Sequence, residues 1–199
     1  MSDDHTHKLG IRWRFIHIPR NGGLSVASAY GRGTEGGHQH LPASCYPDRA
    51  IRLVALIRDP TERAVSLCAH LLAVKNRPLT TADFRDWVAD GCPANFEQGE
   101  ISSFTWRGPS GLRITHPQIA WLNGRVDLLL FERAPRDLAG YMKSLGRRAV
   151  QLPTLNPSQR LRPASLYLDH PTAARLRDIY HEDYELWERL ERRGSRRCF

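Results

Sequence analysis

The stretch Ile51–Ser66, IRLVALIRDPTERAVS, joins a strand pattern directly to a helix-start signal. Ile51–Ile57 is a nearly continuous apolar run, broken only by Arg52, which is typical of a central strand covered on both faces. After it, Asp59 is placed as the N-cap of a helix, Pro60 at its first position and Glu62 for a capping box. We therefore expect a buried strand followed by a helix from Pro60 to about Ala73.

Strand and helix patterns alternate along the rest of the chain. Arg12–Ile18 and Val126–Phe131 are further strand candidates. Helical patterns cover Leu24–Tyr30, Thr81–Ala89, Pro117–Leu122, Pro135–Leu145 with Gly146 as its C′ glycine, and Pro171–Arg193, one long terminal helix capped by Asp169 or His170. This alternation predicts an α/β fold in which helices cover both faces of a central parallel sheet. Ligands of such folds bind at the carboxyl ends of the strands.

Length and charge narrow the class of protein. The 199 residues suit one domain, 1–199, with flexible ends at 1–10 and 194–199. A net charge of +8 implies an anionic partner such as nucleic acid, a membrane surface, an acidic polysaccharide or a nucleotide phosphate. No RNA-binding or recognition-helix motif accompanies the charge, so a nucleic-acid binder rests on charge alone. We expect no nucleic-acid partner.

Targeting signals and cysteine patterns are not visible in the sequence. No apolar run approaches the ~18 residues that span a bilayer, and the N-terminus has no signal-peptide pattern. The four cysteines are scattered without the spacing of a zinc knuckle or a disulfide framework. We expect a soluble, cytoplasmic protein without a membrane span.

The segment Phe15–Ser25, FIHIPRNGGLS, has the features of a phosphate cradle. A strand enters a turn with Gly22 and Gly23, and a helix follows. Adjacent glycines let backbone N–H groups approach an anion, and the helix start adds the positive end of its dipole. Arg20 adds a full charge. The alternative is a tight turn without a ligand, and the GxxxxGK[ST] pattern of nucleotide-triphosphate loops is absent.

A second polar element follows the central strand. Arg58 stands at the carboxyl end of that strand, and Ser66 lies about two turns into the next helix. An arginine fork together with a hydroxyl can hold a phosphate monoester. The alternative is that Arg58 simply pairs with Asp59 or Glu62.

Together the two elements resemble the sulfotransferase superfamily, specifically the carbohydrate (2-O-/chondroitin-type) branch with its small bacterial members. That branch has an IHIPKTGGTS-like loop for the 5′-phosphosulfate of the donor and a VRDPxERxxS stretch for its 3′-phosphate. The second motif is matched in full by Arg58, Asp59, Pro60, Glu62, Arg63 and Ser66. Similar downstream segments are Gln118–Leu122 with Asp127–Glu132, Leu152–Ser158 and Tyr180–Trp187. In the loop, Arg20 replaces the family's Lys, and Asn21 and Leu24 replace two Thr.

The resemblance implies a P-loop-like three-layer α/β/α sandwich and a metal-independent transferase. Its donor would be 3′-phosphoadenosine 5′-phosphosulfate (PAPS), its product 3′,5′-adenosine bisphosphate (PAP), and its acceptor a hydroxyl, on a carbohydrate or a small molecule. A bacterial, cytoplasmic enzyme for carbohydrate sulfation fits this branch. The nucleotide-binding candidates are Arg20, Asn21, Gly22, Gly23, Leu24, Ser25, Arg58, Ser66, Ser158 and Arg160, the last with a solvated loop as its alternative.

The acceptor side is assigned through the segment His38-Gln39-His40, where several family members carry a catalytic His. His40 is the candidate base, because imidazole titrates near neutral pH, and Arg20 would steady the leaving phosphate. His38 and Trp106 are candidates for acceptor contact. Incidental loop histidines, or a zinc site with Cys45 that lacks a fourth ligand, are the alternatives. His17 is expected to be a structural strand residue.

Two other functions compete with sulfotransfer. A nucleotide kinase-like phosphotransferase would need a loop ending in Lys-Ser/Thr, which the turn lacks. A binding protein with a degenerate, non-catalytic donor loop is the other, motivated by the changes at positions 20, 21 and 24. The acceptor and the oligomeric state stay open.

Overall fold

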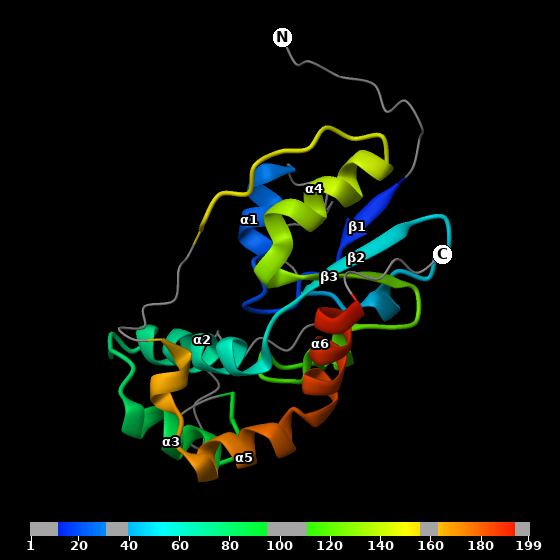
Figure 1. Ribbon diagram of the computed structural model, residues 1–199. Coiled ribbons are helices and arrows are strands. Elements are labelled where there is room, and N and C mark those ends of the chain that lie inside the picture. Colours follow the sequence, from blue (N-terminus) through cyan, green and yellow to red (C-terminus); the bar gives the residue numbers. More distant parts are fainter. Residues whose placement is uncertain (1–11, 31–39, 95–110, 156–162, 194–199) are drawn as a thin grey trace.

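Residues 12–30, 40–94, 111–155 and 163–193 are described by the computed structural model (Figure 1). Three parallel strands form one sheet in the order β1 (Trp13–Phe15), β2 (Arg52–Ile57), β3 (Val126–Leu130). Leu53 is opposite Val126 and Ile57 is opposite Leu130. The predicted α/β fold with a parallel sheet and the buried strand before Arg58 at its centre is confirmed.

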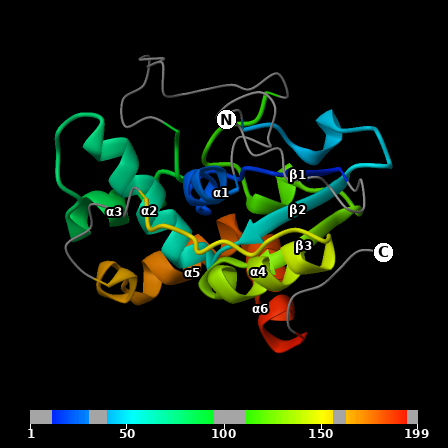
Figure 2. The ribbon, with the colours of Figure 1, turned by 90° about the horizontal axis from the view of Figure 1, so that it is seen from above.

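Helices cover both faces of this sheet (Figures 1 and 2). On one face, α1 (Gly23–Ala29) and α4 (Ala134–Ser144) pack against Val54 and Leu56 of β2. On the other face, α6 (His181–Arg193) and the 3₁₀ turns η1 (Ala43–Cys45) and η2 (Gln118–Trp121) pack against Leu53, Ala55 and Ile57. Because successive strand side chains point to opposite faces, β2 supplies apolar side chains to both cores.

A third group of buried side chains lies mainly between helices. It joins α2 (Pro60–Ala73), α3 (Thr81–Ala89), the 3₁₀ turn η4 (Ala164–Tyr167) and α5 (His170–Ile179), with Phe84 and Trp87 among its largest members. The helix α2 leads from the carboxyl end of β2 into this group (Figure 1). Within the described ranges no helix is both long and apolar enough to cross a membrane.

The start of α2 follows the expected local signals only in part. Asp59 is the N-cap, its Oδ1 accepts the Glu62 backbone N–H at 2.9 Å, and Pro60 is the first helical residue. The capping box, however, was a wrong expectation. The Asp59 backbone N–H donates to Glu132 Oε1 at 2.8 Å instead of to Glu62. Glu132 follows the neighbouring strand β3 in the 3₁₀ turn η3 (Phe131–Arg133), so a tertiary partner takes the place of the local one.

The terminal helix expected over Pro171–Arg193 is two helices, α5 and α6, which meet at Tyr180. Tyr180 is buried, and its hydroxyl donates to the Thr115 carbonyl oxygen at 2.9 Å. The break lets α5 pack on α3 while α6 packs on the sheet. Asp169 is confirmed as the cap of α5, since its Oδ1 accepts the Thr172 N–H at 2.9 Å.

Strand β1 is shorter than the expected range Arg12–Ile18. Ile16 N still donates to the Val54 carbonyl oxygen at 2.8 Å, but Ile18 N turns back to the Ile16 carbonyl at 3.0 Å. The chain therefore leaves the sheet before His17, which brings the His17 side chain to the site described next.

Candidate functional site

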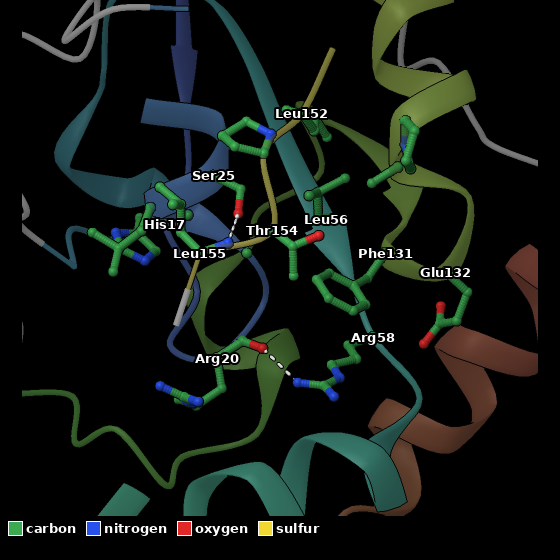
Figure 3. Close-up of a pocket in the computed structure, with 16 residues that line it drawn as sticks. His17, Arg20, Ser25, Leu56, Arg58, Phe131, Glu132, Leu152, Thr154 and Leu155 are labelled. Carbon is green, nitrogen blue, oxygen red and sulfur yellow. Dashed lines mark hydrogen bonds between the residues drawn. The ribbon is translucent and has the colours of Figure 1, made fainter. Parts of the chain in front are cut away.

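A cavity of about 390 Å³ opens at the carboxyl ends of the strands (Figure 3). Its charged and polar lining comes from Arg20, Arg58, Glu132 and His17, and one apolar wall comes from Phe131. The remaining lining residues are Gly22, Gly23, Leu24, Ser25, Leu56, Ala134, Pro135, Leu152, Pro153, Thr154 and Leu155. The position agrees with the sheet edge at which the sequence predicted a ligand.

Both glycines of the turn are required by packing. Gly22 has φ 78°, and a Cβ there would lie 2.9 Å from Phe131 Cε2. A Cβ on Gly23 would overlap the ring of His17. A side chain at either position would therefore displace a ring that lines the cavity.

The start of α1 supplies backbone donors to the cavity. The first bond into the helix is from Val26 N to the Gly22 carbonyl oxygen, at 3.1 Å. The N–H groups of Gly23, Leu24 and Ser25 precede that bond, so they have no acceptor within the helix. All three residues line the cavity. Amides without an acceptor in the helix, together with the positive end of the helix dipole, favour an anion.

Arg20 connects the two sequence motifs. Its backbone has φ 67°, its Nε donates to Ser66 Oγ at 2.9 Å, and its carbonyl oxygen accepts Arg58 Nη1 at 3.0 Å. Burial lowers the pKa of the Arg20 guanidinium, and the nearby charge of Arg58 lowers it further. Because two guanidinium groups of like charge lie close together, the site favours an anion between or beside them.

Arg58 lines the cavity and is buried. Its guanidinium carbon is 4.7 Å from the centroid of the Phe131 ring, which it covers. The alternative pairing with Glu62 is present, because Arg58 Nη2 is 3.4 Å from Glu62 Oε2. The pair lies one helical turn apart and leaves Arg58 among the cavity-lining residues.

Ser66 and Ser25, the two candidate hydroxyls in the described part of the site, occupy different environments. Ser66 is completely buried in α2 and does not line the cavity, so its contact with the site runs through Arg20. Ser25 lines the cavity, and its Oγ accepts the Leu155 N–H at 3.4 Å (Figure 3).

Asn21 points away from the cavity into the core. Its Nδ2 donates to the Leu56 carbonyl at 2.7 Å and to Gln118 Oε1 at 2.6 Å. Gln118 in turn clamps the backbone of Arg58, with Oε1 accepting the Arg58 N–H at 3.0 Å and Nε2 donating to its carbonyl at 2.9 Å. Asp183 accepts the Gln118 and Ile119 N–H groups at 2.7 and 3.0 Å. This network fixes the positions of the segments Phe15–Ser25 and Ile51–Ser66 relative to each other.

His40 lies beside the cavity, in contact with a residue that lines it. Its Nδ1 is 2.9 Å from the His17 carbonyl oxygen, and the two rings have centroids 4.2 Å apart. His17 belongs to the cavity lining and His40 does not. His17 was expected to be a structural residue of the strand, and the early end of β1 is why it reaches the cavity.

Other candidates fall outside the description. His38, Trp106, Ser158 and Arg160 lie outside the described residues. Among the described residues, no three His, Cys, Asp or Glu side chains form a group that could hold a metal ion. The zinc alternative also requires His38.

Sequence patterns did not single out Phe131, Thr154 or Leu155 as site residues. Phe131 was available as a signal, because it directly follows an apolar strand and therefore had to lie at the carboxyl edge of the sheet. The segment 152–155 reaches the cavity through tertiary contacts that no local pattern encodes.

Searches against family models, curated proteins and solved structures found no match to this chain. The functional assignment therefore depends on the site geometry and on the motifs.

Proposed function

We propose that this chain is a PAPS-dependent sulfotransferase with a P-loop-like three-layer α/β/α fold. The observation that carries the proposal is that Arg20, the start of α1 and Arg58 line one cavity, although Arg20 and Arg58 are 38 positions apart. In the proposed complex, the 5′-phosphosulfate lies at Arg20 and the amides of Gly22–Ser25. The 3′-phosphate lies at Arg58.

The chemistry of the cavity lining supports a nucleotide ligand. A nucleotide needs cationic groups for its phosphates and an apolar surface for its base. The cavity combines two arginines with Leu56, Phe131 and Leu152. Its volume of about 390 Å³ is within the range of roughly 300–1,000 Å³ that is usual for small-molecule sites.

The proposed reaction is an in-line displacement at sulfur. The acceptor oxygen forms a bond to sulfur while the bond between sulfur and the bridging phosphate oxygen breaks, and PAP leaves with the electron pair. Arg20 and the α1 amides stabilise the negative charge that develops on the phosphate. Ser66 holds the Arg20 guanidinium in place. The acceptor class implied by the resemblance is a carbohydrate hydroxyl.

The reaction also needs a group that takes the acceptor proton, and the motif comparison selects His40. A carbonyl oxygen only accepts hydrogen bonds, so the contact with His17 O assigns the proton of neutral His40 to Nδ1 and the lone pair to Nε2. That tautomer is suitable for a base. Because His17 lines the cavity and touches the His40 ring, the base is one of these two imidazoles.

The differences between this loop and the loop of the resembled family change the cavity lining less than the sequence alone indicates. Asn21 is buried and bonds to the core, so its replacement of the family's Thr removes nothing from the cavity lining. Leu24 does line the cavity and removes a hydroxyl donor. Binding without turnover, the alternative function, therefore rests on Leu24 and on the exchange of Lys for Arg20.

Calorimetric titration with PAP, in the absence of metal, tests the proposal. Arg58→Ala should weaken PAP binding by about 10- to 100-fold, because a hydrogen bond to a charged group contributes about 1.5–3 kcal/mol. Arg77→Ala is the matched control. Arg77 is exposed, pairs with Asp83 and does not line the cavity, so its removal should leave the affinity unchanged.

Two outcomes would contradict donor binding. One is equal PAP affinity in wild type and Arg58→Ala. The other is a larger thermal stabilisation by ATP with Mg²⁺ than by PAP, which would favour the kinase-like alternative. PAP binding with no release of PAP from PAPS on any hydroxyl acceptor would leave the nucleotide site and overturn the transferase.

A further inference from the structure

Building on the proposed sulfotransfer, we infer that His17 is the catalytic base and that His40 is a positioning residue. His17 is the imidazole of the pair that lines the cavity. It follows the carboxyl end of β1, on the same sheet edge as Arg58 and Phe131. A group that takes a proton from the acceptor must reach the acceptor, and the described geometry gives that access to His17 (Figure 3).

The contact with Gly23 places the His17 ring beside the reacting group. A Cβ on Gly23 would fall on the ring carbon Cδ2 and the ring nitrogen Nε2, so the ring occupies the space that a side chain would fill at the first residue of α1. The amides that follow are those proposed to bind the phosphosulfate. The Nε2 edge of His17 is therefore next to the end of the donor that carries the sulfuryl group.

His40 contacts both the backbone and the ring of His17. Its Nδ1 donates to the backbone carbonyl of His17, its ring lies 4.2 Å from the His17 ring, and the buried Trp121 ring is 6.1 Å behind it. These contacts restrict both the backbone and the ring of His17. His40 thus acts on the reaction through His17.

The proton balance of the step is complete without a further reagent. As the acceptor oxygen bonds to sulfur, its proton moves to His17, and the sulfur–oxygen bond to PAP breaks. The imidazolium then releases the proton to water when the products leave. The rate should therefore rise with pH as His17 loses its proton.

Other titratable groups near His17 are potential sources of the same pH dependence. Arg20, Arg58 and Glu132 share the cavity with His17, and His40 touches it. The helix α1, which packs on the ring, has no titratable side chain. His70 of α2 interacts electrostatically with Arg20 and His40 and is the control that the test requires.

The experiment measures PAP release from PAPS with a panel of acceptors: a neutral oligosaccharide, a uronate-containing oligosaccharide and a phenol. His17→Gln, His40→Gln and His70→Gln are compared with wild type for PAP affinity and for the pH profile of kcat/KM. We expect His17→Gln to keep its PAP affinity within about threefold. Its turnover should fall by about 10²–10⁴-fold, and the acidic limb of the pH profile, in which kcat/KM rises with pH, should disappear. His40→Gln should turn over more slowly but retain that limb, and His70→Gln should resemble wild type.

Two results would overturn the inference while leaving the proposed function intact. They are turnover of His17→Gln within about threefold of wild type, and loss of the acidic limb in His40→Gln or His70→Gln instead. A wild-type protein that does not bind PAP, or that binds PAP but releases none from PAPS, is a separate result, because it overturns the proposed function itself.

A double-mutant cycle covers the case in which His17→Gln does not fold. Gly23→Ala keeps the His17 imidazole but pushes its ring aside, so it should reduce turnover nearly as much as His17→Ala does. In the His17→Ala background the same change meets empty space and should cost little more. Additive losses would contradict a shared action through the His17 ring.

Discussion

Arg20 shows how a single residue can serve both halves of the site. Its Nε holds Ser66 and its carbonyl holds Arg58, while the residue lines the cavity. A lysine ammonium has three donors on one nitrogen, whereas a guanidinium has five donors on three nitrogens, so Nε of Arg20 can bond Ser66 while Nη1 and Nη2 point to a ligand. Arg in place of the Lys of the resembled family is therefore compatible with the proposed donor binding.

The variant Ser66→Ala tests whether this hydroxyl supports Arg20 or contacts the phosphate directly. Because Ser66 is buried and bonds to Arg20, we expect the free energy of unfolding to fall by about 1–3 kcal/mol. The PAP affinity should change much less than in Arg58→Ala. Urea unfolding and calorimetry measure the two effects. Ser144→Ala, which removes the hydroxyl of an exposed serine outside the cavity lining, is the control.

A loss of PAP affinity in Ser66→Ala as large as in Arg58→Ala would contradict the supporting role. It would mean that Ser66 contacts the phosphate directly after Arg20 has moved. Sequence patterns alone assigned Ser66 to the phosphate, because a motif gives the residue type and spacing but not the direction of the side chain. The motif likewise assigned Asn21 to the nucleotide. Its side chain is buried instead against Gln118, which is distant in sequence.

At the scale of elements, α2 supports the loop Arg20–Ser25. Arg63, Ser66 and His70 are spaced by three and four residues and so share one face of the helix. Arg63 is fully buried, and its Nε donates to the Pro19 carbonyl at 3.2 Å. Ser66 Oγ accepts the Arg20 Nε–H at 2.9 Å. Arg63 and Ser66 therefore position the turn that begins the cradle.

The histidine on this face makes stability depend on pH. Burial lowers the pKa of His70 below its ordinary value, and the charges of Arg20 and His40 lower it further. The unfolded chain then binds a proton at higher pH than the folded one, so the contribution is present above about pH 6.5 and is lost as the pH falls through the folded pKa.

The His70→Gln variant should therefore lose less stability than wild type between about pH 7.5 and about pH 5.5. Urea unfolding of both proteins at the two pH values measures this difference, and groups common to both cancel. An equal loss in the two proteins would show that His70 does not titrate differently on folding.

Elements were predictable where their signals are local. The apolar run of β2, the Asp59 cap and the C′ glycine Gly146, with φ 73°, all follow from neighbouring residues. The capping box failed because Glu132 competes for the Asp59 N–H. The break at Tyr180, which has φ −115° and ψ 30°, was missed because no Gly or Pro marks it in the sequence.

At the scale of the whole molecule, the cavity depends on two groups of buried side chains. The sheet with α1 and α4 supplies the cradle and the apolar wall. The helix α2, which also packs in the helical group, supplies Arg63 and Ser66, which bind the Pro19 carbonyl oxygen and Arg20. The α/β class and the sheet edge of the site follow from the alternation of strand and helix patterns in the sequence. That His17 rather than His40 lines the cavity follows only from three-dimensional packing.

A crystal structure of the protein with bound PAP tests the central claim most directly. We predict one PAP in the cavity, with its 3′-phosphate within hydrogen-bond distance of the Arg58 guanidinium and its 5′-phosphate on the amides of Gly22–Ser25 beside Arg20. A PAP molecule bound elsewhere, or one whose 3′-phosphate does not touch Arg58, would contradict the account.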